Sequence, residues 1–234
     1  MRRGILVTVV LVVLLALLAA CGEDDGVAGS SASADNPAAT CSTATPLEGG
    51  SASYEGDPKE MQWNQPPAMA LEEGRDYCAT IKTSKGDIVV DLFEKDAPRT
   101  VNNFVFLAQQ GYYKGVPFHR IISGFMIQTG DPTGTGAGSP GYRFQDELPT
   151  NLNYTRGTLA MANAGPDTNG SQFFICHADL TNSLQKNYSI FGTVTDGIDV
   201  VDAIASVPVG PSRSGEMSSP KEPVSIESVE ITVK

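Results

Sequence analysis

The sequence predicts an all-β protein, a barrel or a sandwich, with two helices covering its ends. Two observations support this prediction. Beyond residue 77, short runs that alternate apolar and polar residues are separated by Gly- and Pro-rich turns, and only two segments have the apolar spacing of a helix. We favour a barrel because a sheet that closes on itself has no exposed edges.

The first 20 residues are typical of a secretory signal peptide. Arg2 and Arg3 precede an uncharged, Leu- and Val-rich run at 4–20, which is short for a membrane-spanning helix. The run ends in LAAC, so we expect cleavage before Cys21 and lipid, palmitate included, on that cysteine. Acyl chains, at roughly 0.8 kcal/mol per buried methylene, would attach the protein to the cell membrane outside the cytoplasm. The alternative is a single uncleaved transmembrane anchor.

Three segments of different composition follow the signal peptide. Residues 21–60 are rich in small and acidic residues and poor in large apolar ones, which predicts a flexible tether. Residues 61–76 contain Trp63 and other apolar residues without a period, which predicts an extended arm. Residues 77–234 contain the strand and helix patterns and are predicted to form the folded domain.

The domain is predicted to begin with a hairpin and to end with a strand. The run CATIKTSKGDIVVDLF at 78–93 alternates on both sides of a Lys-Gly turn. One helix is predicted to begin near Pro98, because proline suits a first turn, and to end at Gly111. A second helix is predicted at 197–206, where apolar residues recur every three positions, and the last strand at 224–233.

Charge and cysteine content exclude several classes of function. Without Arg2 and Arg3, the 16 Lys and Arg residues become 14 against 27 Asp and Glu, a formal charge of −13. So acidic a chain argues against nucleic acid as a partner. Two histidines and no CxxC pair predict no metal site. In an oxidising compartment Cys41 is expected to pair with Cys78, whereas Cys176 lies in an apolar run and is expected in the core.

Three motifs follow one another along the domain. They read FHRIISGFMIQTGD at 118–131, LAMANAGPDTNGSQFFI at 159–175 and YSIFGTV at 188–194. Together they resemble the cyclophilins over about residues 77–234. The resemblance implies a closed eight-stranded antiparallel barrel capped by two α-helices. It also implies peptidyl-prolyl cis-trans isomerase (rotamase) activity without a cofactor, on proline-containing polypeptides, here exported or envelope proteins during their folding.

The resemblance also implies roles for individual residues. Arg120 matches the catalytic arginine of the cyclophilins, and Gln128 matches a polar group that holds the arginine. The substrate-binding positions comprise apolar walls for a proline ring and groups that contact the peptide backbone. They are Phe118, Phe125, Met126, Ala162, Asn163, Gln172, Phe174, Leu184 and Tyr188.

These residue types suit the isomerisation of an X–Pro bond. Amide resonance opposes rotation with a barrier of about 20 kcal/mol. At the twisted transition state the prolyl nitrogen gains a lone pair, and a donor directed at it stabilises that state more than either ground state. Arg120 offers a permanently charged, rigid fork of donors. An apolar cup that buries the proline ring contributes on the order of 1–2 kcal/mol.

Departures from the family and competing functions refine the prediction. Ser183 stands where many cyclophilins have a tryptophan that contributes to ciclosporin binding, so we expect weak ciclosporin binding and retained isomerase activity. The acidic, tethered chain suggests a monomer.

The main alternative function is that of a non-catalytic lipoprotein that binds proline-containing peptides as a chaperone or scaffold. A weaker alternative is a structural lipoprotein in which the domain serves only as a spacer. Arg120 favours the enzyme, because binding alone requires only the apolar cup.

Overall fold

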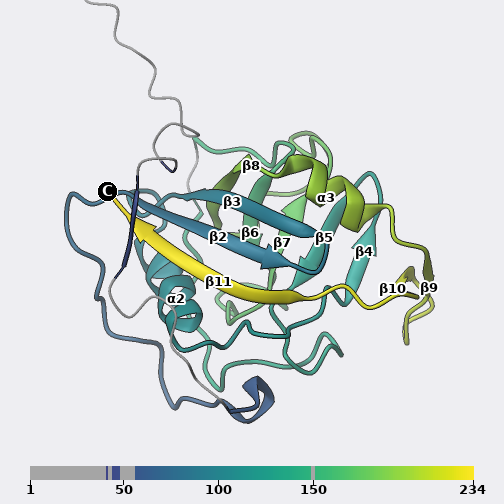
Figure 1. The fold of residues 1–234 in the computed structure, drawn as a ribbon, viewed down its shortest axis with the longest axis horizontal. Helices are drawn as coiled ribbons and strands as arrows, with labels where there is room; N and C mark the ends of the chain where they lie inside the picture. The colour runs from purple at the N-terminus through teal and green to yellow at the C-terminus, as the bar shows by residue number, and fades with distance from the viewer. Residues whose placement is uncertain (1–40, 42–43, 48–55, 149–150) are drawn as a thin grey trace, which may run out of the picture. The chain divides into compact units, whose positions relative to one another are not determined.

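The computed structural model describes residues 41, 44–47, 56–148 and 151–234, so the predicted signal peptide and Cys21 lie outside the described residues. As predicted, this part of the chain is mostly β with two helices (Figure 1). Among the described residues, nine strands form an antiparallel sheet in the order β1-β11-β2-β3-β8-β6-β7-β5-β4, and β9 and β10 form a separate hairpin.

The strands of the main sheet are mostly four to eight residues long. They are β1 (Thr45–Pro46), β2 (Tyr77–Thr83), β3 (Gly86–Leu92), β4 (Arg120–Ile122), β5 (Met126–Thr129), β6 (Thr158–Met161), β7 (Phe173–Cys176), β8 (Ile190–Asp196) and β11 (Ile226–Val233). The other elements are η1 (Pro58–Glu60), α2 (Pro98–Gln109), α3 (Ile198–Ala205), β9 (Val209–Pro211) and β10 (Met217–Pro220).

The closed eight-stranded barrel is not confirmed. In the described part of the chain, the hydrogen-bonded sheet has nine strands and ends at β1 on one side and β4 on the other. The segment before β4 meets the start of β11 irregularly: the Phe118 N–H donates to the Val224 carbonyl at 2.9 Å, and Pro117 forms an isolated bridge with Ser225. Proline has no N–H, so a regular ladder cannot continue through residue 117.

The predicted hairpin, helices and last strand are confirmed. β2 and β3 pair antiparallel, and β11 covers most of the predicted strand at 224–233. α2 has Pro98 in its first turn and is followed by Gly111, whose φ of +73° is a backbone conformation that glycine adopts without strain. In Figure 1, α2 lies at the lower left of the sheet and α3 at its upper right, and both contribute residues to the main core.

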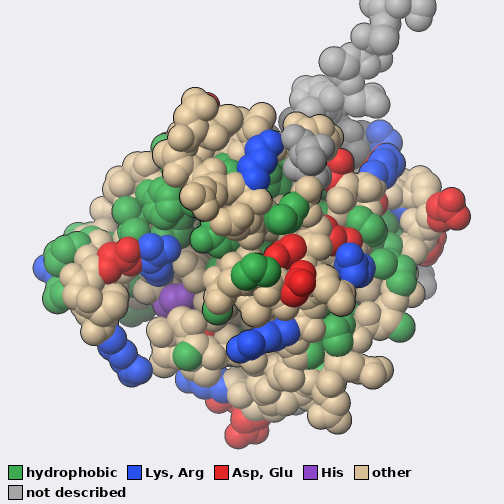
Figure 2. Space-filling view, turned by 180° about the vertical axis from the view of Figure 1, so that it is seen from behind, with side chains coloured by type: hydrophobic (Ala, Val, Ile, Leu, Met, Phe, Trp, Pro, Cys, Tyr) green, Lys and Arg blue, Asp and Glu red, His purple; other side chains and the backbone are tan. Residues whose placement is uncertain are grey.

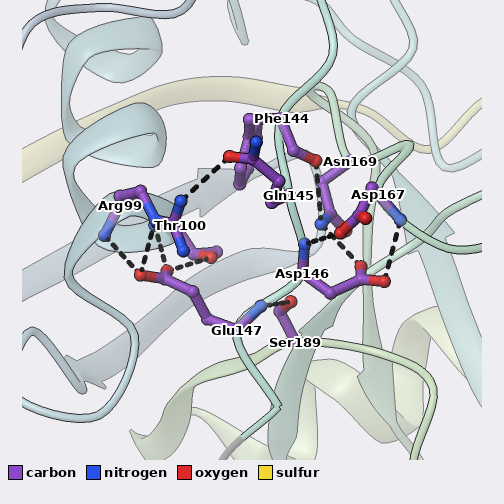
Figure 3. Close-up of polar contacts among 9 residues, drawn as sticks. All are labelled: Arg99, Thr100, Phe144, Gln145, Asp146, Glu147, Asp167, Asn169 and Ser189. Atoms are coloured by element: carbon purple, nitrogen blue, oxygen red, sulfur yellow. Dashed lines mark hydrogen bonds and ion pairs between the residues drawn. The ribbon is translucent and has the colours of Figure 1, made fainter.

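The N-terminus of α2 is satisfied by a residue far along the chain. Ala97 occupies the cap position and offers no side-chain acceptor. Instead the Glu147 carboxylate accepts hydrogen bonds from the Arg99 N–H at 3.1 Å, the Thr100 N–H at 2.8 Å and the Thr100 hydroxyl at 2.8 Å (Figure 3). The Glu147 N–H in turn donates to Ser189 Oγ at 2.8 Å. The segment around Glu147 is therefore fixed to both α2 and the segment before β8.

Apolar side chains cover both faces of the part of the sheet formed by β5, β7 and β6. Along β7, Phe173 and Ile175 belong to the main core, whereas Phe174 and Cys176 belong to a second apolar cluster that includes Met126. This alternation follows from the period of two along a strand. The second cluster is the part of the molecule on which the candidate site is built.

The described residues before β2 contact the domain at several points. Cys41 and Cys78 form a disulfide, which confirms the expected pairing, and Cys176 is free and buried. β1 pairs with β11, although it lies within the segment predicted as a tether. Trp63 packs its ring against Phe106 of α2, with centroids 5.3 Å apart. These contacts place Trp63 against α2.

Candidate active site

Arg120 and Gln128 lie side by side because β4 and β5 form a tight hairpin. Arg120 is opposite Gln128 in the ladder, and Ile122 is opposite Met126. Gly124, with a φ of +77°, occupies the turn between the strands. Since residues two apart on a strand share a face, Arg120, Gln128 and Met126 point to one side. The Arg120 NH1 group lies 3.4 Å from Gln128 Oε1 and 3.9 Å from Met126 Sδ.

A chain of side-chain amides connects Arg120 to a glycine-rich loop at residues 130–141. Gln128 Nε2 donates to Gln172 Oε1 at 3.0 Å, and Gln172 Nε2 donates to the carbonyls of Gly136 and Gly138, each at 3.0 Å. Gln128 can therefore present its carbonyl oxygen to Arg120 and its amino group to Gln172 at the same time. The orientation of both amides is fixed by the direction of these bonds.

Asp131 organises the glycine-rich loop. Its carboxylate accepts hydrogen bonds from the N–H groups of Thr133, Thr135, Gly136 and Gly138 at 2.7–3.1 Å. Burial raises the pKa of Asp131, but the hydrogen bonds that it accepts outweigh burial, so the pKa is lower than its ordinary value. The sequence analysis did not identify Asp131 as part of the site, although it ends the first motif.

The apolar side chains form a cup beside Arg120. Met126 and Phe174 are buried, and Phe125, Leu184 and Tyr188 pack against them while remaining partly exposed. The Phe174 and Tyr188 rings meet edge to face, with centroids 5.5 Å apart. Met126 and Phe174 thus form the buried floor of this cluster, and Phe125, Leu184 and Tyr188 form its partly exposed rim.

His177 forms two hydrogen bonds with the turn that contains Gly124 and Phe125. The Gly124 N–H donates to His177 Nδ1 at 2.8 Å, and the His177 N–H donates to the Phe125 carbonyl at 2.9 Å. His177 Nε2 lies 3.0 Å from the Asp202 carboxylate of α3, which also pairs with Arg156 at 2.7 Å. Because Nδ1 accepts a hydrogen bond, this arrangement requires the tautomer with a proton on Nε2.

Two hollows meet the site at Gln128, which lines both of them. The first, of about 480 Å³, lies between Arg120, the loop at 134–136 and the β9–β10 hairpin. The second, of about 350 Å³, is lined by Gln172, Ala162, Asn163 and part of the same loop. Burial lowers the pKa of His119, which lines the first hollow, so its imidazole is neutral at pH 7.

The structure brings together all but one of the site residues expected from the sequence. Phe118 differs: it is fully buried in the main core and lines neither hollow. The residues gathered around the cup and the two hollows are Arg120, Phe125, Met126, Gln128, Ala162, Asn163, Gln172, Phe174, Leu184 and Tyr188.

The structure adds Glu216, which the sequence analysis did not identify. Glu216 lies at the tip of the β9–β10 hairpin, 96 residues from Arg120. Arg120 Nε donates to Glu216 Oε2 at 2.7 Å, and Arg120 NH2 donates to Glu216 Oε1 at 2.8 Å. These hydrogen bonds lower the pKa of Glu216 to about 2. The motif around Glu216, RSGEM, has no spacing that relates it to Arg120.

Comparison with known proteins assigns this fold and site to a family. Residues 78–231 match the family described as cyclophilin type peptidyl-prolyl cis-trans isomerase/CLD. The chain therefore belongs to the cyclophilin-type peptidyl-prolyl cis-trans isomerases, as the motifs indicated. The residues around the cup are those that carried the resemblance.

Two relatives and one solved structure illustrate the match. A peptidyl-prolyl cis-trans isomerase of Helicobacter pylori is 51% identical over 129 residues, 54% of this chain and 78% of the relative. Mouse peptidylprolyl isomerase domain and WD repeat-containing protein 1 is 49% identical over 160 residues, 67% of this chain and only 24% of that longer protein. A Cryptosporidium parvum cyclophilin type isomerase, solved in the presence of the dipeptide Ala-Pro, has a TM-score of 0.61 and 39% identity, over 66% of this chain and 98% of that one.

Proposed function

We propose that Arg120 is the catalytic residue and that the apolar cup binds the proline ring of a polypeptide substrate. The direction of the Arg120 NH1 group is the observation that supports this most. NH1 lies 3.9 Å from Met126 Sδ, in the floor of the cup, and 3.4 Å from Gln128 Oε1. A proline ring seated on Met126 and Phe174 would bring its nitrogen within reach of NH1.

Rotation about the X–Pro bond would follow from this placement. The cup would fix the ring, so that the part of the peptide before the proline turns. As the prolyl nitrogen loses conjugation and gains a lone pair, an N–H of Arg120 would donate to it. Because arginine stays protonated at all physiological pH values, no proton transfer is needed. Gln128 would support this donor through the carbonyl oxygen that faces NH1.

The peptide on either side of the proline would lie along the two hollows. Ala162, Asn163 and Gln172 line the second hollow, and the glycine-rich loop separates it from the first. Proline-containing polypeptides are the substrate class that these surfaces fit, and the Ala-Pro dipeptide of the Cryptosporidium structure is of the same class. Acidic and basic side chains are interspersed on the face drawn in Figure 2, without a continuous basic area that would favour nucleic acid.

We further propose that the protein is a lipoprotein that acts on exported or envelope proteins outside the cytoplasm. The LAAC sequence that ends at Cys21 supports lipidation at that residue. The Cys41–Cys78 disulfide suits an oxidising compartment. Among the described residues, no helix is long and apolar enough to cross a membrane. The protein would act as a monomer, and Ser183 in place of a groove tryptophan would leave ciclosporin binding weak.

A protease-coupled isomerisation assay on the full chain in detergent tests the catalytic role. We expect Arg120→Ala to abolish measurable turnover while a proline-containing peptide still binds with similar affinity. Equal rates in wild type and Arg120→Ala would refute the catalytic role of Arg120. Loss of binding together with turnover would indicate that the arginine serves peptide capture instead. Mass spectrometry of the membrane-extracted protein tests for lipid on Cys21.

A further inference from the structure

The β9–β10 hairpin brings a carboxylate to the arginine of the site. Arg120 has two edges that can donate hydrogen bonds. Its Nε and NH2 groups form one edge, and both donate to Glu216 at 2.7 and 2.8 Å. Such a two-point contact fixes the plane of the guanidinium as well as its position. The NH1 group is left on the opposite side, where it faces Gln128 and Met126.

Glu216 holds the guanidinium more closely than Gln128 does. The single contact to Gln128 Oε1 is 3.4 Å long, whereas both contacts to Glu216 are shorter than 2.9 Å. Hydrogen bonds between charged groups are also stronger than those between a charged group and an amide. The carboxylate, rather than the amide, therefore decides where NH1 points.

The backbone of the hairpin fixes the position of Glu216. The Ser212 N–H donates to the Glu216 carbonyl at 2.7 Å, and the Gly215 N–H donates to the Ser212 carbonyl at 3.0 Å. Gly215 has a φ of +86°, which the tight turn requires. The side chain of Ser218, two residues after Glu216, is buried. Glu216 thus projects from a closed turn of fixed geometry.

The exposure of the pair argues for a role in positioning and against a role in stability. The Arg120 and Glu216 side chains are 34% and 39% exposed. Ion pairs this exposed contribute little to folding. They can still select one rotamer of a long side chain, and a misplaced donor weakens a transition state strongly.

We propose that Glu216 is a positioning residue that orients the Arg120 guanidinium so that NH1 points into the proline cup. This inference rests on the proposed catalytic role of Arg120. It makes the β9–β10 hairpin, which contributes nothing to the apolar cup, part of the isomerase machinery.

The test measures kcat and KM for a proline-containing peptide with the full chain in detergent. Glu216→Ala should lower kcat about fivefold with KM changed less than about twofold, because the donor is misoriented while the cup is intact. Glu216→Gln, which keeps an acceptor, should recover about half of the loss. Glu222→Ala removes the same charge from an exposed position just beyond β10 and should change neither constant.

A double-mutant cycle separates this inference from the catalytic role of Arg120. If Glu216 acts through Arg120, then Glu216→Ala lowers kcat less in an Arg120→Lys chain, whose turnover is reduced but measurable, than in wild type. An equal loss in both backgrounds, or an unchanged or raised kcat in Glu216→Ala alone, would overturn the positioning role. An unchanged rate in Arg120→Ala would instead overturn the proposed function.

An NMR measurement keeps the inference testable if Glu216→Ala folds poorly. The Arg120 Nε–H resonance should exchange slowly with water in wild type and in Glu216→Gln, because a carboxylate or amide oxygen accepts its hydrogen bond. Fast exchange in wild type would contradict the observed pairing and overturn the inference.

Discussion

Glu147 and Glu216 both pair with an arginine from a distant segment of the chain, but the surroundings of the two carboxylates are opposite. Glu147 pairs with Arg99, and there the carboxylate is buried, at 9% exposure, while the arginine is 52% exposed. Glu216 pairs with Arg120, and there both side chains are about one-third exposed. Glu147 also accepts hydrogen bonds from two backbone N–H groups of α2, whereas the Glu216 carboxylate accepts two hydrogen bonds from the guanidinium.

The difference shows that the contribution of an ion pair, to stability or to geometry, depends on the other groups that its two side chains contact. The buried carboxylate at Glu147 satisfies a helix N-terminus that has no side-chain cap of its own, so its contribution is to stability. The exposed carboxylate at Glu216 satisfies one edge of an arginine whose other edge faces the cup, so its contribution is to geometry. Similar distances therefore have different consequences, and the following predictions test this.

The largest effect is expected from replacing Arg120 by lysine, with Arg99→Lys as the matched control. Arg120→Lys should lower kcat/KM about 10- to 100-fold, because an ammonium cannot bind Glu216 at two points and also reach the cup. Arg99→Lys should leave kcat/KM unchanged. Steady-state kinetics on both variants checks this, and a similar loss in the two would contradict the distinction.

The second largest effect is expected from Glu147→Ala, which should lower stability without changing activity. Glu147→Ala leaves the first N–H groups of α2 without their acceptor and should lower the free energy of unfolding by about 2 kcal/mol. Denaturant unfolding measures it, with Glu227→Ala, an exposed carboxylate on β11, as the matched control. The kcat/KM of the folded variant should equal that of wild type, and a lower value would assign Glu147 to the active site.

Asp91 extends the comparison to a carboxylate that has no ion pair within the described residues. It lies opposite Cys78 in the β2–β3 ladder, and its carboxylate is within 4.8 Å of the Cys41 and Cys78 sulfur atoms. Burial, followed by the nearby Glu94 and Asp76 carboxylates, raises the pKa of Asp91 from 3.8 to about 6.

The raised pKa predicts the sign of a pH dependence. A protonated Asp91 stabilises the folded state, and this contribution is complete below pH 3.8 and is lost as the pH rises to about 6. The loss is on the order of 1–2 kcal/mol, given partial exposure. Unfolding of wild type and Asp91→Asn between pH 3.5 and pH 7 checks this, since the difference between them should grow with pH. A constant difference would contradict it.

The smallest effect is expected at the rim of the cup. Ser183 is exposed and lies next to Leu184. Ser183→Trp should bind ciclosporin about tenfold more tightly, because an aromatic ring there adds apolar contact area. Stability and kcat should change little. Competition binding measures the affinity, and an unchanged affinity would show that residue 183 does not contact the ligand.

The regular elements could be predicted because their signals are local. Alternation predicted β2 and β3, and Pro98 and Gly111 delimited α2, since each signal involves residues within one element. The irregular pairing around Pro117 that leaves the sheet unclosed could not be predicted, because it depends on where Ser225 lies in space. The same holds for β1, which pairs with β11 only in the folded chain.

The candidate site divides in the same way. The sequence by itself identified Arg120, Gln128 and the apolar residues of the cup, through the resemblance of the chain to the cyclophilins. The β4–β5 hairpin then explains why Arg120, Gln128 and Met126 share one face, because residues two apart on a strand point to the same side. Only the tertiary structure decided that Glu216 orients Arg120 and that Glu147 caps α2. In both cases the carboxylate comes from a distant segment, and contacts between distant segments have no fixed spacing along a chain.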